Sequence, residues 1–279
     1  MKTSLVALTA GLILVARWTH AETPGAGLPP GEAQAKAALN SSPRHGEWVD
    51  VPLPGKATPL RCFVVYPEVK NKAPVVLVIH EIFGLTDWAR AVADRLAADG
   101  FIAIAPDLLS GKGPGGGGTE SIGSRDDVMK LIRELSPEEV ALALDAARAY
   151  ALKLSAANGK SACIGFCWGG AMSFQYATAQ PELEAAVVYY GPNPAEPALL
   201  KRIRAPVLGF YGGDDARVVT TIEPAAAQMK KLGKSYTWQV YDGAGHGFLR
   251  AQDERNGANR KAAEQAWPAT IAFLKKQLQ

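Results

Sequence analysis

Cysteine and histidine are scarce in this chain of 279 residues, which contains three cysteines and four histidines. An odd number of cysteines cannot form a closed set of disulfides, so a disulfide-stapled scaffold is not predicted. Cys62 and Cys163 lie in apolar, strand-like runs, where we expect buried and inert thiols; a bridge between them is the less favoured alternative. Asp214-Asp215 lacks histidine or carboxylate partners at ligand spacing, so no metal is predicted.

A large charge of one sign and a long apolar run are also lacking. The formal net charge is +3 and no Lys/Arg cluster occurs, which gives no reason to expect nucleic acid as a partner. The apolar segment 5–15 is too short to span a bilayer comfortably. It follows Met1-Lys2 and precedes Thr19-His20-Ala21, whose small residues stand where a signal peptidase reads. We therefore expect residues 1–21 to be a signal peptide. The protein would then be periplasmic or secreted, with no stable membrane insertion after cleavage; an uncleaved anchor is the alternative.

The remaining composition predicts one large domain. Apolar residues make up 48% of the chain, enough to bury a full core. Residues 22–45 are rich in Ala, Gly and Pro, and we expect a mobile N-terminal segment there with one short helix near residues 33–39. Residues 46–279 show no internal repeat and no break in composition. They are predicted to form a single domain.

β-rich and helical segments alternate along this domain. Strands are expected at residues 47–53, 60–66, 74–80, 101–106, 161–164, 185–190, 206–211 and 236–241, and helices at residues 87–99, 137–154 and 258–278, with further helical stretches between the later strands. Pro54-Gly55-Lys56 separates the first two strands and predicts an antiparallel hairpin. The alternation beyond it is typical of a doubly wound, mainly parallel α/β sheet with helices on both faces.

One stretch, Ser110 to Ser124, is of low complexity and rich in glycine. Its Gly111-x-Gly113-x-x-Gly116 spacing matches a dinucleotide fingerprint, but no helix starts at the third glycine and no acidic partner follows at the required distance. No organic cofactor is therefore predicted. The stretch is either a surface loop or a lid, since it leaves the carboxyl end of a strand, where such sheets bind ligands.

The most informative motif is Gly165-Phe166-Cys167-Trp168-Gly169-Gly170. It stands between an apolar strand-like run and a helical stretch, which is the context of a nucleophile elbow. Small residues on either side let the backbone turn sharply and present Cys167 above the sheet. We expect the N-terminus of the following helix to lower the pKa of the thiol.

A nucleophile of this kind requires a base and an acid that orients it. Of the four histidines, His246 lies in a Gly-flanked loop after the last expected strand and is the candidate base. The acid should follow an earlier strand, where Asp214 and Asp215 are adjacent; only one of them can face the imidazole. Nucleophile, acid and histidine in this chain order are typical of α/β-hydrolases.

An oxyanion formed at Cys167 would need two donors. The backbone N–H of Trp168 is one candidate, and that of Ile82, in the loop after strand 74–80, is the other. Glu81 precedes Ile82; it is either a surface charge at a strand end or a proton acceptor that otherwise raises the pKa of the thiol.

Together these residues resemble the dienelactone hydrolase family of α/β-hydrolases over residues 47–277. The resemblance rests on residues 80–84, 165–170, 212–218 and 245–248. It implies that Asp215 is the acid of a Cys167–His246–Asp215 triad and that Glu81 takes the thiol proton when substrate binds. It also supports Ile82 and Trp168 as the oxyanion hole.

The resemblance further implies a site for a substrate carboxylate. Arg250 stands four residues after His246, where the family carries one of two arginines. At the second position this chain has Ser110, Gly111 and Lys112, and a lysine lacks the planar fork of a guanidinium. Arg250, Lys112 and Phe83 are therefore the predicted substrate-binding residues, with dienelactone itself in doubt and a solvated charge as the alternative for Arg250.

These features predict a hydrolase of small-molecule esters or lactones that acts through a thioester acyl-enzyme. Acyl transfer or thiol redox chemistry at the same cysteine is an alternative activity. The alternative that is not an enzyme is a binding protein with the same fold. The sequence leaves a monomer and a small homo-oligomer equally open.

Overall fold

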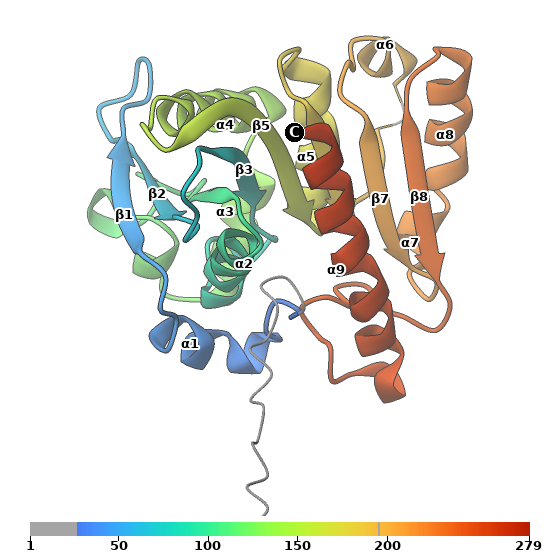
Figure 1. The fold of residues 1–279 in the computed structure, drawn as a ribbon, viewed down its shortest axis with the longest axis horizontal. Coiled ribbons are helices and arrows are strands. Elements are labelled where there is room, and N and C mark those ends of the chain that lie inside the picture. Colours follow the sequence, from blue (N-terminus) through green and yellow to red (C-terminus); the bar gives the residue numbers. More distant parts are fainter. Residues whose placement is uncertain (1–26, 195) are drawn as a thin grey trace, which may run out of the picture.

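The computed structural model describes residues 27–194 and 196–279. The predicted signal peptide, residues 1–21, lies outside them. The described residues form one eight-stranded sheet in the order β1-β2-β4-β3-β5-β6-β7-β8 (Figure 1). The strands are β1 (Gly46–Val51), β2 (Leu60–Val65), β3 (Ala73–Ile79), β4 (Ile102–Pro106), β5 (Ala157–Phe166), β6 (Ala185–Tyr189), β7 (Val207–Gly212) and β8 (Tyr236–Tyr241).

Strand pairing follows the predicted plan. β1 and β2 form an antiparallel hairpin, and β2 also pairs antiparallel with β4. From β4 through β8 every pairing is parallel. β3, β4 and β6 are almost continuously buried, as expected of strands covered on both faces. The carboxyl ends of β3, β5, β7 and β8 consequently meet at one edge of the sheet.

Helices cover both faces, as the alternation predicted. On one face α2 (Asp87–Ala98) and α9 (Ala258–Gln277) pack over the sheet, and α9 crosses it in the foreground of Figure 1. On the other face lie α4 (Pro137–Leu152), α5 (Trp168–Ala179) and α8 (Ile222–Lys231). α4 begins with a capping box, in which Ser136 and Glu139 bond to each other's backbone N–H. The shorter elements are α1 (Glu32–Asn40), α3 (Arg125–Arg133), α6 (Pro197–Leu200), α7 (Ala216–Val219), η1 (Pro114–Gly116), η2 (Thr119–Ser121) and η3 (Arg255–Gly257).

The described part of the N-terminal segment packs against the domain, whereas the sequence predicted a loosely attached segment. Its helix, α1, is present and contacts α2, with Ala35 fully buried. The carbonyl of Pro29 accepts a hydrogen bond of 2.8 Å from Gln252 Nε2, and that of Pro30 accepts one of 3.1 Å from Trp88 Nε1. Side chains distant in the sequence supply these bonds, so local composition could not reveal them.

The glycine-rich loop is fixed at its centre. Asp107, just after β4, accepts hydrogen bonds from the backbone N–H of Thr119 at 2.8 Å and from its hydroxyl at 2.7 Å. The Thr119 hydroxyl oxygen in turn accepts a bond of 3.1 Å from the backbone N–H of Leu85, in the loop after β3. The loop is thus joined to the loop that follows β3. Its closure over a bound substrate stays a prediction.

Within residues 27–194 and 196–279, none of the helices combines the length and apolarity that crossing a bilayer requires. All three cysteines are free thiols, and Cys62 and Cys163 are buried within the sheet, as predicted. Burial raises the pKa of the Cys163 thiol to about 12, and it also raises the pKa of Cys62. Cys167 is the one cysteine that is partly accessible.

Candidate active site

The nucleophile elbow has the predicted form. β5 ends at Phe166, α5 begins at Trp168, and Cys167 between them adopts φ 56° and ψ −117°. A residue with a side chain rarely adopts positive φ, and strain of this kind persists only where the surrounding packing enforces it. A Cβ atom at Gly165 would overlap the carbonyl of Gly169, and one at Gly169 would overlap the carbonyl of His80. Both glycines are therefore needed for the turn that exposes the thiol.

His246 connects the thiol to a carboxylate. Its Nε2 lies 3.0 Å from Sγ of Cys167, and its Nδ1 lies 2.5 Å from Oδ2 of Asp215. Since a carboxylate accepts, Nδ1–H is the donor, which leaves the Nε2 lone pair directed at the thiol. The neighbouring Asp214 instead pairs with Arg255 at 3.0 Å. The structure thus brings Cys167, His246 and Asp215 together and places Asp214 elsewhere.

The resting thiol is held protonated. Burial, and secondly the charge of Glu81, raise the pKa of Cys167 to about 11. The backbone N–H groups of Trp168 and Ile82 act in the opposite direction and lower this pKa. The predicted lowering of the pKa by the helix N-terminus is therefore present but outweighed. The same two N–H groups are the predicted oxyanion donors, and both affect the pKa of the thiol.

Glu81 is a buried carboxylate near Cys167. Its side chain is only 4% exposed, and its Oε2 lies 2.6 Å from Nε of Arg250. The contact is a close ion pair without hydrogen-bond geometry. Burial raises the pKa of Glu81 to about 7, and the positive charge of Arg250 opposes that rise. A carboxyl group poised near neutrality can either hold or release a proton, as an acid–base group must.

His80 was not predicted to take part, yet it fixes the loop that carries Glu81 and Ile82. It is fully buried; its Nδ1 donates to the backbone carbonyl of Glu81 at 2.8 Å, and its Nε2 accepts from the backbone N–H of Leu108 at 3.3 Å. Burial lowers the pKa of His80, which keeps the ring neutral. Its ring also stacks on Trp168 with centroids 5.9 Å apart. The signal in the sequence that could have indicated this role is the position of the histidine at the end of a buried strand.

Tyr190 is a second residue that the sequence did not single out. It is fully buried with φ 41°, and its ring meets the ring of His246 edge-on at 5.3 Å between centroids. Its hydroxyl has no hydrogen-bond partner among the described residues. Burial, and then the charge of Glu81, hold the pKa of Tyr190 well above its ordinary value. The hydroxyl therefore remains a neutral donor close to the cluster.

Two of the three predicted substrate-binding residues lie beside Glu81. Arg250 contacts Glu81, as described, and its Cζ lies 5.3 Å from the ring centroid of Phe83. Two residues that the sequence did not single out join them. Cζ of Arg125, on α3, lies 3.6 Å from the same ring centroid, and the carboxylate of Glu32, on α1, forms ion pairs with both arginines.

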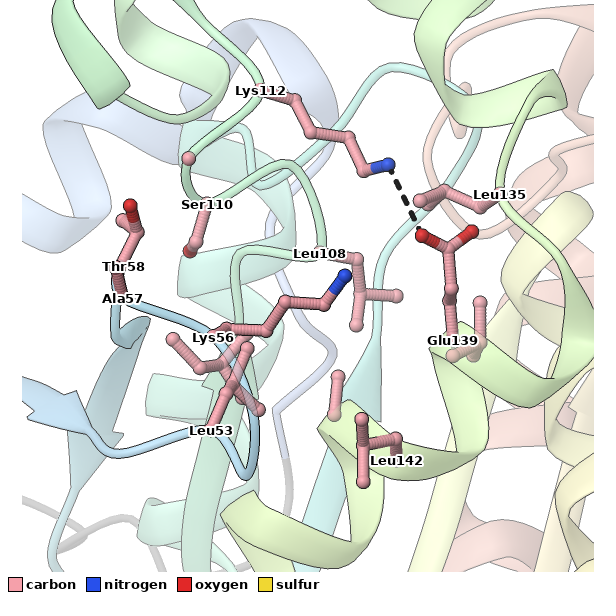
Figure 2. Close-up of a pocket in the computed structure, with 14 residues that line it drawn as sticks. Leu53, Lys56, Ala57, Thr58, Leu108, Ser110, Lys112, Leu135, Glu139 and Leu142 are labelled. Atoms are coloured by element: carbon pink, nitrogen blue, oxygen red, sulfur yellow. Dashed lines mark hydrogen bonds and ion pairs between the residues drawn. The ribbon is translucent and has the colours of Figure 1, made fainter.

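The structure does not bring Lys112 to this cluster. Its Nζ lies 3.4 Å from Oε1 of Glu139, at the start of α4. Figure 2 shows this pair in a separate pocket, which is lined by Leu53, Lys56, Ala57, Thr58, Leu60, Leu108, Ser110, Gly111, Lys112, Leu135, Glu139, Val140, Leu142 and Ala143. Cys167, His246 and Asp215 are not part of that lining. The loop after β4 turns toward α4 and carries Lys112 with it.

In the described residues, no group of three or more His, Cys, Asp and Glu side chains is arranged to hold a metal ion. The chemistry available at the site is that of a thiol, an imidazole, two carboxylates and a guanidinium. A thiol with a base at 3.0 Å can attack a carbonyl carbon, and the backbone N–H groups of Trp168 and Ile82 are the candidates to stabilise the resulting oxyanion.

The chain is similar to known proteins in both sequence and structure. Residues 60–278 match the model of the family described as "Dienelactone hydrolase family". A protein of Yersinia pestis named "Putative carboxymethylenebutenolidase" is 30% identical over 248 residues, covering 85% of this chain and 91% of its own. A protein of Saccharolobus solfataricus with the same name is 29% identical over 253 residues, covering 78% of this chain and 94% of its own.

Solved structures agree on the architecture. The crystal structure of a "Putative Dienelactone Hydrolase" from Klebsiella pneumoniae superimposes with a TM-score of 0.74 at 26% identity, covering 84% of this chain and 99% of its own. The dienelactone hydrolase of Anabaena variabilis superimposes with a TM-score of 0.64 at 21% identity, covering 85% and 99%. At 21% identity the similarity shows only a shared fold, which is the α/β-hydrolase fold.

Proposed function

Since the chain belongs to the dienelactone hydrolase family, we propose that it hydrolyses small carboxylic esters or lactones through a thioester on Cys167. The observation that carries the proposal is the continuous contact from Sγ of Cys167 through the imidazole of His246 to the carboxylate of Asp215. The thiol is the nucleophile, His246 its base, and Asp215 the group that orients the base and stabilises its positive charge.

The first half-reaction forms the thioester. His246 Nε2 accepts the thiol proton, and the sulfur attacks the carbonyl carbon of the substrate. The carbonyl oxygen becomes an oxyanion, which the N–H groups of Ile82 and Trp168 bind. When the intermediate collapses, the C–O bond to the alcohol breaks and the imidazolium returns its proton to the departing alkoxide. The alcohol leaves, and the acyl group stays on Cys167.

The second half-reaction releases the acid. Water attacks the thioester carbon while His246 Nε2 takes one of its protons. Collapse of the second intermediate breaks the C–S bond, and the proton returns to the sulfur. The carboxylic acid departs and the thiol is restored. No oxidant, metal or organic cofactor enters this cycle.

Glu81 governs how readily the thiol ionises. Its negative charge helps to keep Cys167 protonated while the site is empty, which limits reactions of the thiol with oxidants and other electrophiles. With its pKa near 7, Glu81 can also accept the thiol proton once its contact with Arg250 changes. We therefore assign it as a second proton acceptor beside His246.

The proposal is tested by turnover of dienelactone and of a simple aryl ester by the wild-type protein and the Cys167→Ala variant, with Cys163→Ala as the matched control. The proposal predicts aryl-ester turnover that requires Cys167 and is retained in Cys163→Ala. Turnover of dienelactone as well would place that lactone among its substrates. Ester hydrolysis by Cys167→Ala at the wild-type rate would refute the proposal.

A further inference from the structure

The pocket that contains Lys112 is separate from the catalytic residues (Figure 2). Three segments that are distant in the sequence line it: the turn between β1 and β2, the loop after β4, and the first two turns of α4. Its volume is about 230 Å³. An apolar cavity of about 150 Å³ accommodates benzene, so this pocket has room for a chain of about eight to ten carbons.

The walls of the pocket are mostly aliphatic. Five leucines and one valine are among the lining residues, and none of the described lining residues is aromatic. Leu60, Leu108 and Val140 are buried, whereas Leu142, on α4, is 36% exposed. A flexible alkyl chain would bury apolar surface against these side chains and would cover that of Leu142. An aromatic ligand would find no ring in the lining on which to stack.

Two lysines and one acidic residue set the charge of the pocket. Nζ of Lys112 lies 3.4 Å from Oε1 of Glu139, whose Oε2 accepts a bond of 3.1 Å from the backbone N–H of Ser136. The hydrogen bond from Ser136, and then the charge of Lys112, lower the pKa of Glu139, which stays ionised. Glu139 therefore balances one lysine. The second lysine, Lys56, leaves the described lining with one net positive charge, which matches a monoanion.

Lys56 lies in the turn between β1 and β2. Its charge acts on Glu139, as that of Lys112 does, and Figure 2 shows the ammonium ends of both lysines directed toward the Glu139 side of the pocket. The turn packs closely against the loop after β4, because a Cβ atom at Gly111 would meet Cβ of Thr58 at 3.1 Å. Turn and loop together therefore present two ammonium groups to one pocket, and an ammonium group is a strong donor to a carboxylate.

Leu108 lies between the pocket and the loop that carries Glu81. Its side chain lines the pocket, and its backbone N–H donates to Nε2 of His80 at 3.3 Å. Cys167 and His246 are not in the lining. A molecule in this pocket would therefore contact the support of the catalytic loop but not the thiol.

We propose that this pocket binds an aliphatic monocarboxylate of about eight to ten carbons, with its chain among the leucines and its carboxylate at Lys56 and Lys112. The pocket is then a second ligand site, separate from the catalytic centre. The inference goes beyond the proposed hydrolysis of esters and does not depend on it.

Isothermal titration calorimetry with octanoate tests the proposal. We expect one site, with Kd about fivefold to tenfold weaker for hexanoate, which is shorter by two methylenes, and also weaker for 1-octanol, which lacks the charge. Lys56→Gln and Leu142→Gln should each weaken octanoate binding about threefold to tenfold. Lys70→Gln and Val69→Gln make the same kinds of change at exposed positions outside the lining and should leave Kd at the wild-type value.

The catalytic centre is the alternative place for octanoate, since a hydrolase of esters would release such an acid there. Titration of protein alkylated at Cys167 by iodoacetamide distinguishes the two sites. The proposal predicts that octanoate binding survives alkylation and is weakened by Lys56→Gln. Loss of binding on alkylation, no binding to the wild-type protein, or equal Kd values for wild type, Lys56→Gln and Leu142→Gln would overturn it.

Discussion

Nε of Arg250 lies 2.6 Å from Oε2 of Glu81, and this ion pair holds a buried carboxylate next to the thiol that it helps to keep protonated. The relationship gives Arg250 influence over Cys167 although the two residues are not in contact through any hydrogen bond of the described structure. A ligand that draws Arg250 away from Glu81 would make that carboxylate a better proton acceptor. We therefore expect an anion that draws Arg250 away from Glu81 to favour ionisation of Cys167.

The first prediction concerns Glu81→Gln, for which thiol reactivity and catalysis should change in opposite directions. Without the neighbouring charge the pKa of Cys167 falls, so iodoacetamide should alkylate it about threefold to tenfold faster at pH 8. Ester turnover should fall about 100-fold, because a proton acceptor is lost. If both rates rose together, Glu81 would only suppress the thiol and would have no part in turnover.

The pH dependence of stability provides a second test of Glu81. Burial raises its pKa from 4.5 to about 7, so between these values the folded chain binds more protons there than the unfolded chain does. This contribution to the free energy of unfolding must then fall as pH rises from 4.5 to about 7, and stay constant above it. Urea unfolding of wild type and Glu81→Gln across this range measures the difference, which should shift in favour of Glu81→Gln as pH increases. A difference independent of pH would contradict the raised pKa.

Replacing Asp215 by Asn should leave the fold intact and remove most of the activity. An amide in that position favours the His246 tautomer with its proton on Nε2, which can no longer accept the thiol proton. We expect kcat to fall by about 10³- to 10⁴-fold. Circular dichroism and thermal unfolding report the fold, and Asp214→Asn, which alters the pair with Arg255, is the matched control. Equal losses in the two variants would reject the assignment of Asp215.

His80→Leu should be costly for both stability and turnover. It removes the donor to the Glu81 carbonyl and leaves the backbone N–H of Leu108 buried without its partner. The loss should lower the free energy of unfolding by about 2–4 kcal/mol in urea titrations, the range for an unsatisfied buried group and a lost hydrogen bond. His45→Leu, at a side chain that is 70% exposed, is the control. A His80→Leu variant with wild-type stability would show that the hydrogen bonds of His80 do not stabilise the loop that carries Glu81.

Much of the fold and the centre of the site could be predicted because their signals are local. The hairpin, the buried strands and the capping box at Ser136 each follow from a few adjacent residues. The same is true of the turn at Cys167, where the glycines that permit the turn are close neighbours of the cysteine in the sequence. His246 could be found because so few histidines are present.

What could not be predicted depends on contacts between distant segments. Glu32 and Arg250 are 218 positions apart, and no local pattern indicates that they meet. Arg125 follows the glycine-rich loop, and its helix, although capped by Ser124, was not identified. The protonation state of Cys167 could not be predicted either. Its pKa depends on burial, the charge of Glu81 and two backbone N–H groups, whose positions only the assembled structure gives.

The residue that becomes acylated during turnover can be identified directly. Wild-type protein is mixed with para-nitrophenyl acetate, quenched in acid within the burst phase, digested and analysed by mass spectrometry, with Cys167→Ala and Cys163→Ala in parallel. A thioester mechanism predicts one acetyl group on the peptide that contains Cys167. Neutral hydroxylamine should release this group, which should be present in Cys163→Ala and absent in Cys167→Ala. An acetyl group on another residue, or continued turnover by Cys167→Ala at the wild-type rate, would contradict this mechanism.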